Sequence, residues 1–258
     1  MNIAICFLST VKNHFNLENL KIQAKNSKLH NIDVYEYIEN NDYTYNIEDK
    51  KIYFNLYFLS KKYKWDHIHD NVGNKIRDKA GLLFLPLIDL YTNFKDKYDM
   101  YLFYEDDVSY FGTENLFDII NFNSDVVFQD QRITVDDDHW VWWYDWRNNN
   151  NVTNDVKIDR NIIKILYHGL LNFYGLKPYV IEKFLNFIKD NYAFYELLIS
   201  AFILNDNYSV HYINDYIQSY FSFNNDAPIS NKYLLVHPVK TIEKYQSIKS
   251  KFNFNKNM

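Results

Sequence analysis

The sequence has a single cysteine, no long hydrophobic run and no excess of basic residues. Cys6 excludes a disulfide within the chain, and we expect it to be a small buried hydrophobe in a reducing compartment. The longest apolar stretch, residues 80–90, is too short to span a membrane and contains Asp89. The 258 residues carry a formal net charge of -5 without a basic stripe, which argues against a nucleic-acid partner.

The two ends of the chain bear on location. Residues 2–8 have no basic region before them and no small-residue cleavage site after them, so we expect no signal peptide and a cytoplasmic location. The last segment, residues 244–258, holds lysines among tyrosine and phenylalanine. We expect a solvated helix in this tail. Peripheral contact of the tail with an anionic membrane surface is the alternative.

Strand-like and helix-like segments alternate along the chain. The apolar patterns predict strands at 2–8, 33–38, 100–104, 125–129, 210–213 and 233–236, and helices at 15–26, 52–63, 75–94, 162–174, 178–191 and 192–204. This order predicts an α/β fold with a mostly parallel, Rossmann-like central sheet flanked by helices. We expect one domain over residues 1–243, followed by the tail 244–258.

Three consecutive carboxylates, Glu105, Asp106 and Asp107, follow the aromatic strand 100–104. If that strand is buried at the centre of the sheet, they lie at its carboxyl end, where open α/β sheets bind ligands. Glu105 and Asp107 are two positions apart, so on an extended chain they point the same way and can share one cation. A solvated turn or the N-cap of a following helix is the alternative interpretation.

Four segments in this order resemble a glycosyltransferase with a GT-A type fold, especially the small bacterial or viral sugar transferases that use nucleotide-sugar donors. They are the strand 3–8 with Ser9 and Thr10 after it, the glycine-containing segment 71–81, the strand 101–108 with its acidic motif, and the segment 195–199. The motif is written Glu-Asp-Asp here rather than Asp-x-Asp. The resemblance covers roughly residues 1–240.

The resemblance implies an activity and its partners. We expect a metal-dependent glycosyltransferase of the hexosyltransferase type that uses Mn²⁺ or Mg²⁺. It moves a sugar from a nucleoside-diphosphate sugar, with a UDP-sugar as the first choice. The acceptor is a hydroxyl of a glycan, which is free, lipid-linked or protein-linked. A hard cation would stabilise the negative charge that develops on the departing diphosphate.

The donor side takes its residues from the acidic motif and the segments before it. Asp107 is the first choice as metal ligand. Glu105 binds the metal or the nucleotide, and Asp106 supports both. The resemblance also places Ser9 after the first strand among the nucleotide contacts. Lys75 and Arg77 supply positive charge near the sugar or diphosphate, with a solvated helix N-terminus as the alternative.

A late strand delivers two further donor-side candidates. The apolar run 234–236 is followed by His237 and then by Lys240. In the enzymes that this chain resembles, a late histidine completes the metal shell and a nearby basic residue holds the diphosphate. Histidine suits Mn²⁺ better than Mg²⁺. A surface histidine after a strand is the alternative.

The acceptor side rests on aromatic residues and carboxylates. Four of the five tryptophans fall within residues 140–146, a segment suited to stacking on sugar rings and equally suited to a packed hairpin. Asp145 lies in this segment as a candidate base. Glu196 is our preferred general base for an inverting transfer, and a helix N-terminal carboxylate is its structural alternative.

Two other functions remain open from the sequence. A nucleotidyltransferase acting on a sugar phosphate also places carboxylates at strand ends, but it needs a glycine-rich basic loop after the first strand. Residues 9–13 are not glycine-rich, so this enzyme ranks second. A non-catalytic glycan-binding module built on Trp140–Trp146 would bind sugar without requiring a nucleotide or Asp107.

Overall fold

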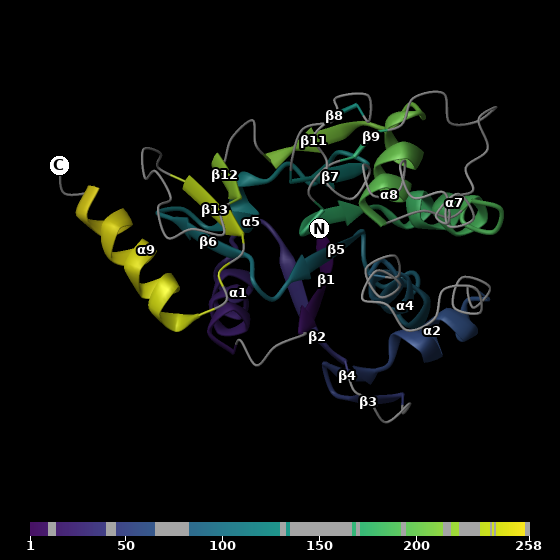
Figure 1. Ribbon diagram of the computed structural model, residues 1–258, viewed down its shortest axis with the longest axis horizontal. Coiled ribbons are helices and arrows are strands. Elements are labelled where there is room, and N and C mark those ends of the chain that lie inside the picture. The colour runs from purple at the N-terminus through teal and green to yellow at the C-terminus, as the bar shows by residue number, and fades with distance from the viewer. Residues whose placement is uncertain are drawn as a thin grey trace, which may run out of the picture.

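The computed structural model describes residues 1–9, 14–39, 45–64, 83–129, 133–134, 167–168, 171–191, 195–213, 218–221, 233–237, 239 and 241–255. Their strands form a central eight-stranded sheet (Figure 1). Across this sheet the order is β11 (Val210–Tyr212), β7 (Val126–Phe128), β10 (Phe173–Leu176), β5 (Met100–Glu105), β1 (Asn2–Ser9), β2 (Asn31–Glu39), β4 (Lys51–Phe54) and β3 (Asn46–Glu48).

The central sheet is mixed but mostly parallel. Strand β1 pairs in parallel with both β2 and β5, β2 with β4, and β7 with β11. Strand β10 is antiparallel to both of its neighbours, and β3 is antiparallel to β4. The predicted α/β fold with a mostly parallel central sheet is therefore confirmed.

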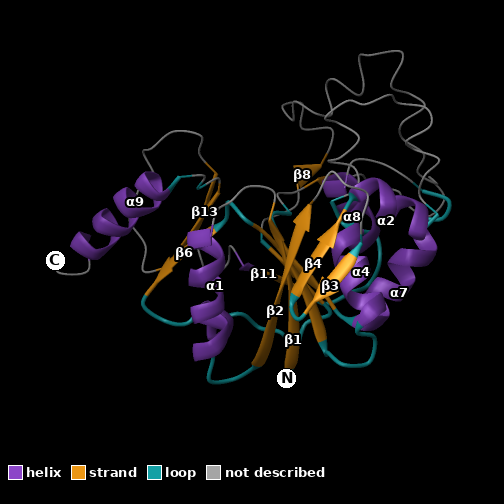
Figure 2. Cartoon of the chain, turned by 90° about the horizontal axis from the view of Figure 1, so that it is seen from below, coloured by secondary structure: helices purple, strands orange, loops and turns teal. Residues whose placement is uncertain are grey.

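Helices cover both faces of the sheet, and Figure 2 shows α1 on one side with α4 and α7 on the other. One face packs against α2 (Leu56–Lys62), α4 (Leu85–Asn93), α7 (Pro178–Phe187) and α8 (Tyr195–Leu204). The opposite face packs against α1 (His14–Asn26) and α5 (Leu116–Ile119). Because β5 and β1 are covered on both faces, almost all of their side chains are buried and apolar.

A smaller unit stands beside the central sheet (Figure 1). Its three strands are β12 (Gln218–Phe221), β13 (Tyr233–His237) and β6 (Ser109–Gly112), with the C-terminal helix α9 (Ile242–Asn255) against β6. A two-stranded pair, β8 (Ile133–Thr134) and β9 (Tyr167–His168), is separate. Ile248 of α9 is 2% exposed and packs on the small sheet, so α9 is docked rather than fully solvated. The helix also runs across the domain boundary that we predicted at residue 244; the division itself stays a prediction.

Two predicted helices are wrong in part. Residues 162–174 were expected to be helical, but the described part of this segment contains β9 and the start of β10. Residues 52–63 were expected to form one helix, but residues 51–54 form β4 and the helix begins only at Leu56. The Asn55 side chain accepts from the backbone N–H groups of Tyr57 and Phe58, and this N-cap sets the boundary.

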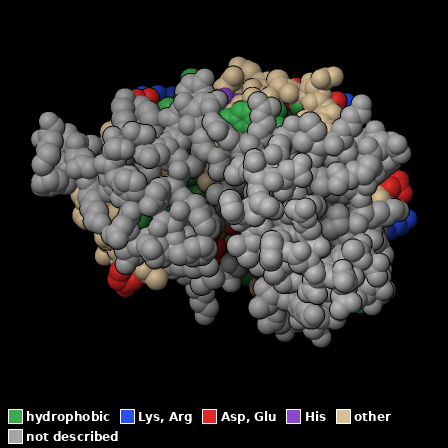
Figure 3. Space-filling view, turned by 45° about the horizontal axis from the view of Figure 1, so that its top comes forward, with side chains coloured by type: hydrophobic (Ala, Val, Ile, Leu, Met, Phe, Trp, Pro, Cys, Tyr) green, Lys and Arg blue, Asp and Glu red, His purple; other side chains and the backbone are tan. Residues whose placement is uncertain are grey.

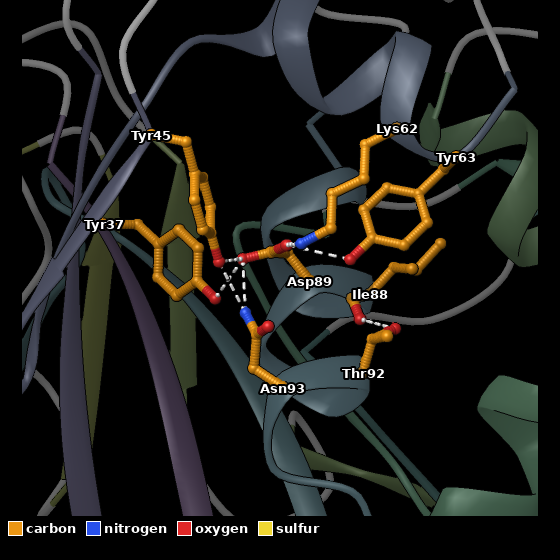
Figure 4. Close-up of polar contacts among 8 residues, drawn as sticks. All are labelled: Tyr37, Tyr45, Lys62, Tyr63, Ile88, Asp89, Thr92 and Asn93. Carbon is orange, nitrogen blue, oxygen red and sulfur yellow. Dashed lines mark hydrogen bonds and ion pairs between the residues drawn. The ribbon is translucent and has the colours of Figure 1, made fainter.

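Asp89 of α4 is a buried carboxylate that joins several elements on one face of the sheet (Figure 4). Its two oxygens accept hydrogen bonds from Tyr37 Oη (3.1 Å), Tyr45 Oη (2.8 Å), Lys62 Nζ (2.7 Å), Tyr63 Oη (2.8 Å) and Asn93 Nδ2 (2.9 Å). The donors come from β2, the residue before β3, α2, the residue directly after α2, and α4. Burial, followed by the Asp89 charge, raises the pKa of Tyr37 well above its ordinary value.

Charged side chains among the described residues appear in small groups of both signs around the margin of the face in Figure 3. Within the described part of the chain, none of the helices combines the length and apolar character needed to cross a bilayer.

Candidate functional site

The acidic motif lies in a buried turn at the carboxyl end of β5. Asp106 is 4% exposed and Asp107 is 9% exposed. Glu105 N–H donates to the carbonyl of Asn172 at 2.9 Å, and Asp106 N–H donates to the carbonyl of Leu8 at 3.1 Å. The turn is therefore held by both strands beside β5, because Leu8 belongs to β1 and Asn172 directly precedes β10. It is not a solvated surface turn.

The C-terminal segment closes over this turn. Val239 N–H donates to the carbonyl of Asp107 at 2.6 Å. The Asn16 side chain of α1 donates to the carbonyls of both Asp106 (2.5 Å) and Val239 (3.2 Å), and Asn16 itself is 2% exposed. Ser109 donates its hydroxyl hydrogen to Asn16 Oδ1. Asn16 thus connects α1, the acidic turn and the segment before α9, and our sequence analysis did not identify it.

A lysine ammonium stands near the acidic turn. Lys244 lies in the first turn of α9, and burial lowers its pKa below the ordinary lysine value. The negative charge of Asp107 acts in the opposite direction and raises the same pKa. Asp107 is therefore within electrostatic range of a partly buried cation, Lys244, which the sequence analysis did not identify.

A second polar group lies on the side of the turn that faces α4 and α8. Asn172 Nδ2 donates to Glu105 Oε2, and Tyr174 follows on the same face of the sheet, stacked on Phe103. Burial, and then the charges of Cys6 and Glu105, raise the pKa of Tyr174 well above its ordinary value. Within the described residues, neither Asn172 Oδ1 nor the Tyr174 hydroxyl has a hydrogen-bond partner. Both atoms are enclosed by the fold, so their burial without a partner is unfavourable at this position.

The predicted site residues divide into three groups. Ser9, Glu105, Asp106 and Asp107 come together, since Leu8 pairs with Glu105 and Ser9 follows it at the end of β1. His237 ends β13, and its neighbour Val236 pairs with Ser109, so the backbone brings it beside the acidic turn; its side chain lies outside the described part. Glu196 lies in the first turn of α8, again without a described side chain.

The remaining predicted residues cannot be placed. Lys75, Arg77, Asp145 and Lys240 lie outside the described residues. The tryptophan cluster, residues 140–146, also lies outside them. The assignments of these residues stay predictions.

The donor chemistry of the acidic turn fits a hard divalent cation, because carboxylate oxygens are the ligands that Mg²⁺ and Mn²⁺ prefer. Within the described residues, however, no three His, Cys, Asp or Glu side chains gather closely enough to hold a metal ion. A complete set of ligands therefore needs a group beyond the described side chains, and His237, which follows the strand residue paired with Ser109, is a candidate.

Comparison with known proteins gives structural similarity only. No family model matches the chain, and no curated protein matches it. The chain is similar to the apo structure of mouse xyloside xylosyltransferase 1, with 10% identity and a TM-score of 0.41 over 85% of this chain and 88% of that one. It is also similar to galactosyltransferase LgtC in complex with donor and acceptor sugar analogs, with 8% identity and a TM-score of 0.44 over 96% and 83% of the two chains.

A third similar structure is HddC from Yersinia pseudotuberculosis, with 11% identity and a TM-score of 0.41 over 97% of this chain and 99% of that one. The structural neighbours therefore include GT-A glycosyltransferases over most of the chain, at low sequence identity. A likeness at this level concerns the arrangement of the fold, and the function has to be argued from the residues of the site.

Proposed function

We propose that this protein is a metal-dependent glycosyltransferase that transfers a sugar from a nucleoside-diphosphate sugar to a glycan or glycoconjugate hydroxyl. One observation carries the proposal. The acidic turn Glu105–Asp107 lies at the carboxyl end of a central parallel strand, its residues Asp106 and Asp107 are buried, and a lysine from α9 lies near it. Buried carboxylates are unfavourable unless cations or hydrogen-bond donors compensate their negative charge. A bound divalent cation would supply this compensation and would in turn bind the diphosphate of the donor.

The roles of the residues follow from this placement. Asp107 and Glu105 would hold the cation, with His237 as the third donor. When bound, the cation would act as a Lewis acid toward the diphosphate. Lys244 would add positive charge where the leaving diphosphate gains negative charge. Asn172 would orient Glu105 through its amide, and Asn16 would hold the turn and the C-terminal segment together.

The donor and the bases are further parts of the proposal. A UDP-sugar remains the first choice of donor, and Mn²⁺ or Mg²⁺ the cation. Ser9, Lys75, Arg77 and Lys240 remain the proposed contacts to the nucleotide, sugar or diphosphate. Glu196 and Asp145 remain the candidate bases that would accept the proton of the acceptor hydroxyl.

A thermal-shift experiment tests the proposal. The melting temperature of the protein is measured with UDP and with GDP, each in the presence and absence of Mn²⁺. We expect one diphosphate to raise the melting temperature when Mn²⁺ is present and to have little effect without it. The Asp107→Asn variant should fold normally and lose this metal-dependent shift, together with transfer of sugar from the matching nucleotide sugar.

Asp96→Asn is the matched control, because Asp96 is exposed near the amino end of β5 and its positive φ of 68° is one that asparagine tolerates. It should keep the full shift. Retention of the metal-dependent shift by Asp107→Asn would contradict the metal assignment. Stabilisation by glycans alone, with no response to any diphosphate, would favour the glycan-binding module instead.

A further inference from the structure

A pocket lies between α1 and the outer part of the sheet, away from the acidic turn. It has a volume of about 410 Å³, which is within the usual range for small-molecule sites. Strand β4 pairs with β2 only from Glu36 onward, so the first half of β2 has no described outer neighbour. Ala24 of α1 faces this opening with a single methyl group. The short β4 and the small side chain together leave the space open.

Glu36 lies at the inner end of this pocket. It is 6% exposed, and strand alternation places its side chain on the same face of β2 as Ile32 and Val34, which also line the pocket. Its backbone N–H donates to the carbonyl of Lys50 at 2.8 Å. Its carboxylate, in contrast, makes no hydrogen bond or ion pair with any residue that the structure describes. Its oxygens are not fully enclosed, so a donor that enters the pocket can reach them.

Four lysines surround the pocket, and two of them are already engaged. The Lys50 ammonium pairs with Asp33 at 2.5 Å, and the Lys21 ammonium pairs with Glu18 at 3.3 Å. Lys25 and Lys51 are exposed and form no ion pair within the described part of the chain. Lys51 pairs in register with Glu36 across the two strands, so its side chain starts from the same face. The pocket thus combines an acceptor inside with available cations at its mouth.

We propose that this pocket binds a small hydroxylated anion of the phosphorylated-sugar class. The sugar hydroxyls would donate to Glu36, the phosphate would lie between Lys25 and Lys51, and the apolar ring face would cover Ile32 and Val34. This site goes beyond the proposed transferase activity. Glu36 lies two strands away from β5 on the face that α1 covers, whereas the Glu105 side chain points to the other face.

Calorimetric titration tests the proposal with three probes: glucose 6-phosphate, glucose alone and inorganic phosphate alone. We expect glucose 6-phosphate to bind, and glucose alone and phosphate alone to bind at least tenfold more weakly. The reason is that Glu36 contacts the sugar whereas the lysines contact the phosphate. Glu36→Gln should weaken glucose 6-phosphate binding about tenfold, the loss expected for a hydrogen bond to a charged group. Glu48→Gln, an exposed carboxamide substitution on β3, should bind like the wild type.

The melting temperature of the ligand-free protein separates this site from a structural ion pair. If Glu36 is an accessible acceptor that awaits a ligand, Glu36→Gln should leave the melting temperature within about 1 °C of the wild type, and so should Lys51→Gln. If Glu36 instead pairs with Lys51 in solution, both Glu36→Gln and Lys51→Gln should lower the melting temperature, and that result would overturn the proposal. Equal binding by wild type and Glu36→Gln, or no binding of glucose 6-phosphate, would also overturn it.

The two proposals can be tested and contradicted independently of each other. Asp107→Asn should leave the glucose 6-phosphate affinity unchanged, and Glu36→Gln should leave the metal-dependent diphosphate shift unchanged. A Glu36 variant that loses both responses would instead indicate a global defect, which circular dichroism would reveal.

Discussion

Asn172 contacts the acidic turn in two ways, and only one of them depends on its side chain. Its backbone carbonyl accepts from Glu105 N–H at 2.9 Å, and its amide donates to Glu105 Oε2. Asn172→Ala keeps the first bond and removes the second. If Glu105 holds the cation or the nucleotide, a carboxylate without its orienting partner should lower sugar transfer 10- to 100-fold, as for other groups that orient metal ligands. Initial rates at several Mn²⁺ concentrations measure this loss.

The melting temperature of Asn172→Ala shows whether this variant is folded, so that a lower transfer rate can be assigned to the site. Asn207→Ala, at an exposed turn between α8 and β11, is the control and should leave transfer unchanged. If Asn172→Ala transfers sugar at the wild-type rate with an unchanged Mn²⁺ requirement, Glu105 does not need this partner and its proposed role is wrong.

Sequence reasoning found the acidic residues but not the residues that hold them. Glu105, Asp106 and Asp107 stand out because three adjacent charges interrupt an apolar strand. Asn16 and Asn172 are common polar residues whose importance comes from contacts about 90 and 67 positions away along the chain. No local pattern encodes such contacts. The pairing of β10 with β5 was needed to identify Asn172, and the contact of α1 with the acidic turn was needed to identify Asn16.

At the scale of elements, the Asp89 network joins α4 to α2 and β2, and it gives a stability prediction. Asp89 is fully buried and ion-paired with Lys62, so Asp89→Ala leaves that ammonium without its partner and the tyrosine hydroxyls without their acceptor. We expect the free energy of unfolding to fall by about 3–5 kcal/mol. Urea denaturation at neutral pH measures the change.

Asp89→Asn retains one acceptor oxygen and should lose less stability than Asp89→Ala. Restoring an apolar fit with the double variant Asp89→Leu, Lys62→Met should recover part of the loss, because both charges then leave the interior together. A loss below about 1 kcal/mol for Asp89→Ala would mean that water replaces the carboxylate at this position.

Asp125 connects the start of β7 to the segment before β11 and to the residue before α7, and it predicts a pH dependence. Its carboxylate accepts from Ser209 N–H (3.0 Å) and Oγ (2.8 Å) and from Lys177 Nζ (3.2 Å). Burial raises its pKa, but these bonds and one from Tyr179 outweigh burial and hold the pKa well below the ordinary aspartate value.

A folded-state pKa below the unfolded one means that Asp125 contributes stability above the unfolded pKa of about 4. This contribution is lost as the pH falls from there through the lower folded pKa. We therefore expect Asp125→Asn to be less stable than the wild type at pH 7 and the difference to shrink toward zero below pH 4. Urea midpoints between pH 7 and pH 2 measure it. A difference that is constant with pH would show that the charge itself is not involved.

The predicted elements show which signals the sequence carries. Strand β1, helix α1 and helix α7 were predicted because their apolar residues repeat with the period of one element, and Pro178 marks the start of α7. Strand β10 was missed because residues 162–174 have helical spacing. A Cβ at Gly175 would come within 2.2 Å of Leu102 Cδ2, so this glycine allows β10 to pack against β5. That close approach depends on a strand more than 70 residues away.

At the scale of the whole molecule, the site is made by joining two sheets. The acidic turn belongs to the central sheet, whereas Val239 and Lys244 follow β13 of the smaller sheet. The two parts are connected by β6, which continues from the turn and pairs with β13. The spacing of these segments in the sequence, more than 130 residues, explains why a motif search sees two separate weak signals rather than one site.

The docking of α9 should therefore control the acidic turn. Ile248 is 2% exposed among Phe111, Val236 and Val239, so Ile248→Asp places a charge in that small core and should release the helix locally. If Lys244 and the segment at Val239 complete the diphosphate site, this release should weaken metal-dependent UDP binding about tenfold while the central sheet keeps its far-ultraviolet spectrum. Ser247→Asp adds the same charge at an exposed neighbouring position and should bind UDP normally. Limited proteolysis reports the release of α9 directly. If α9 is cleaved readily while the UDP affinity stays at the wild-type level, the C-terminal segment only covers the turn and takes no part in binding.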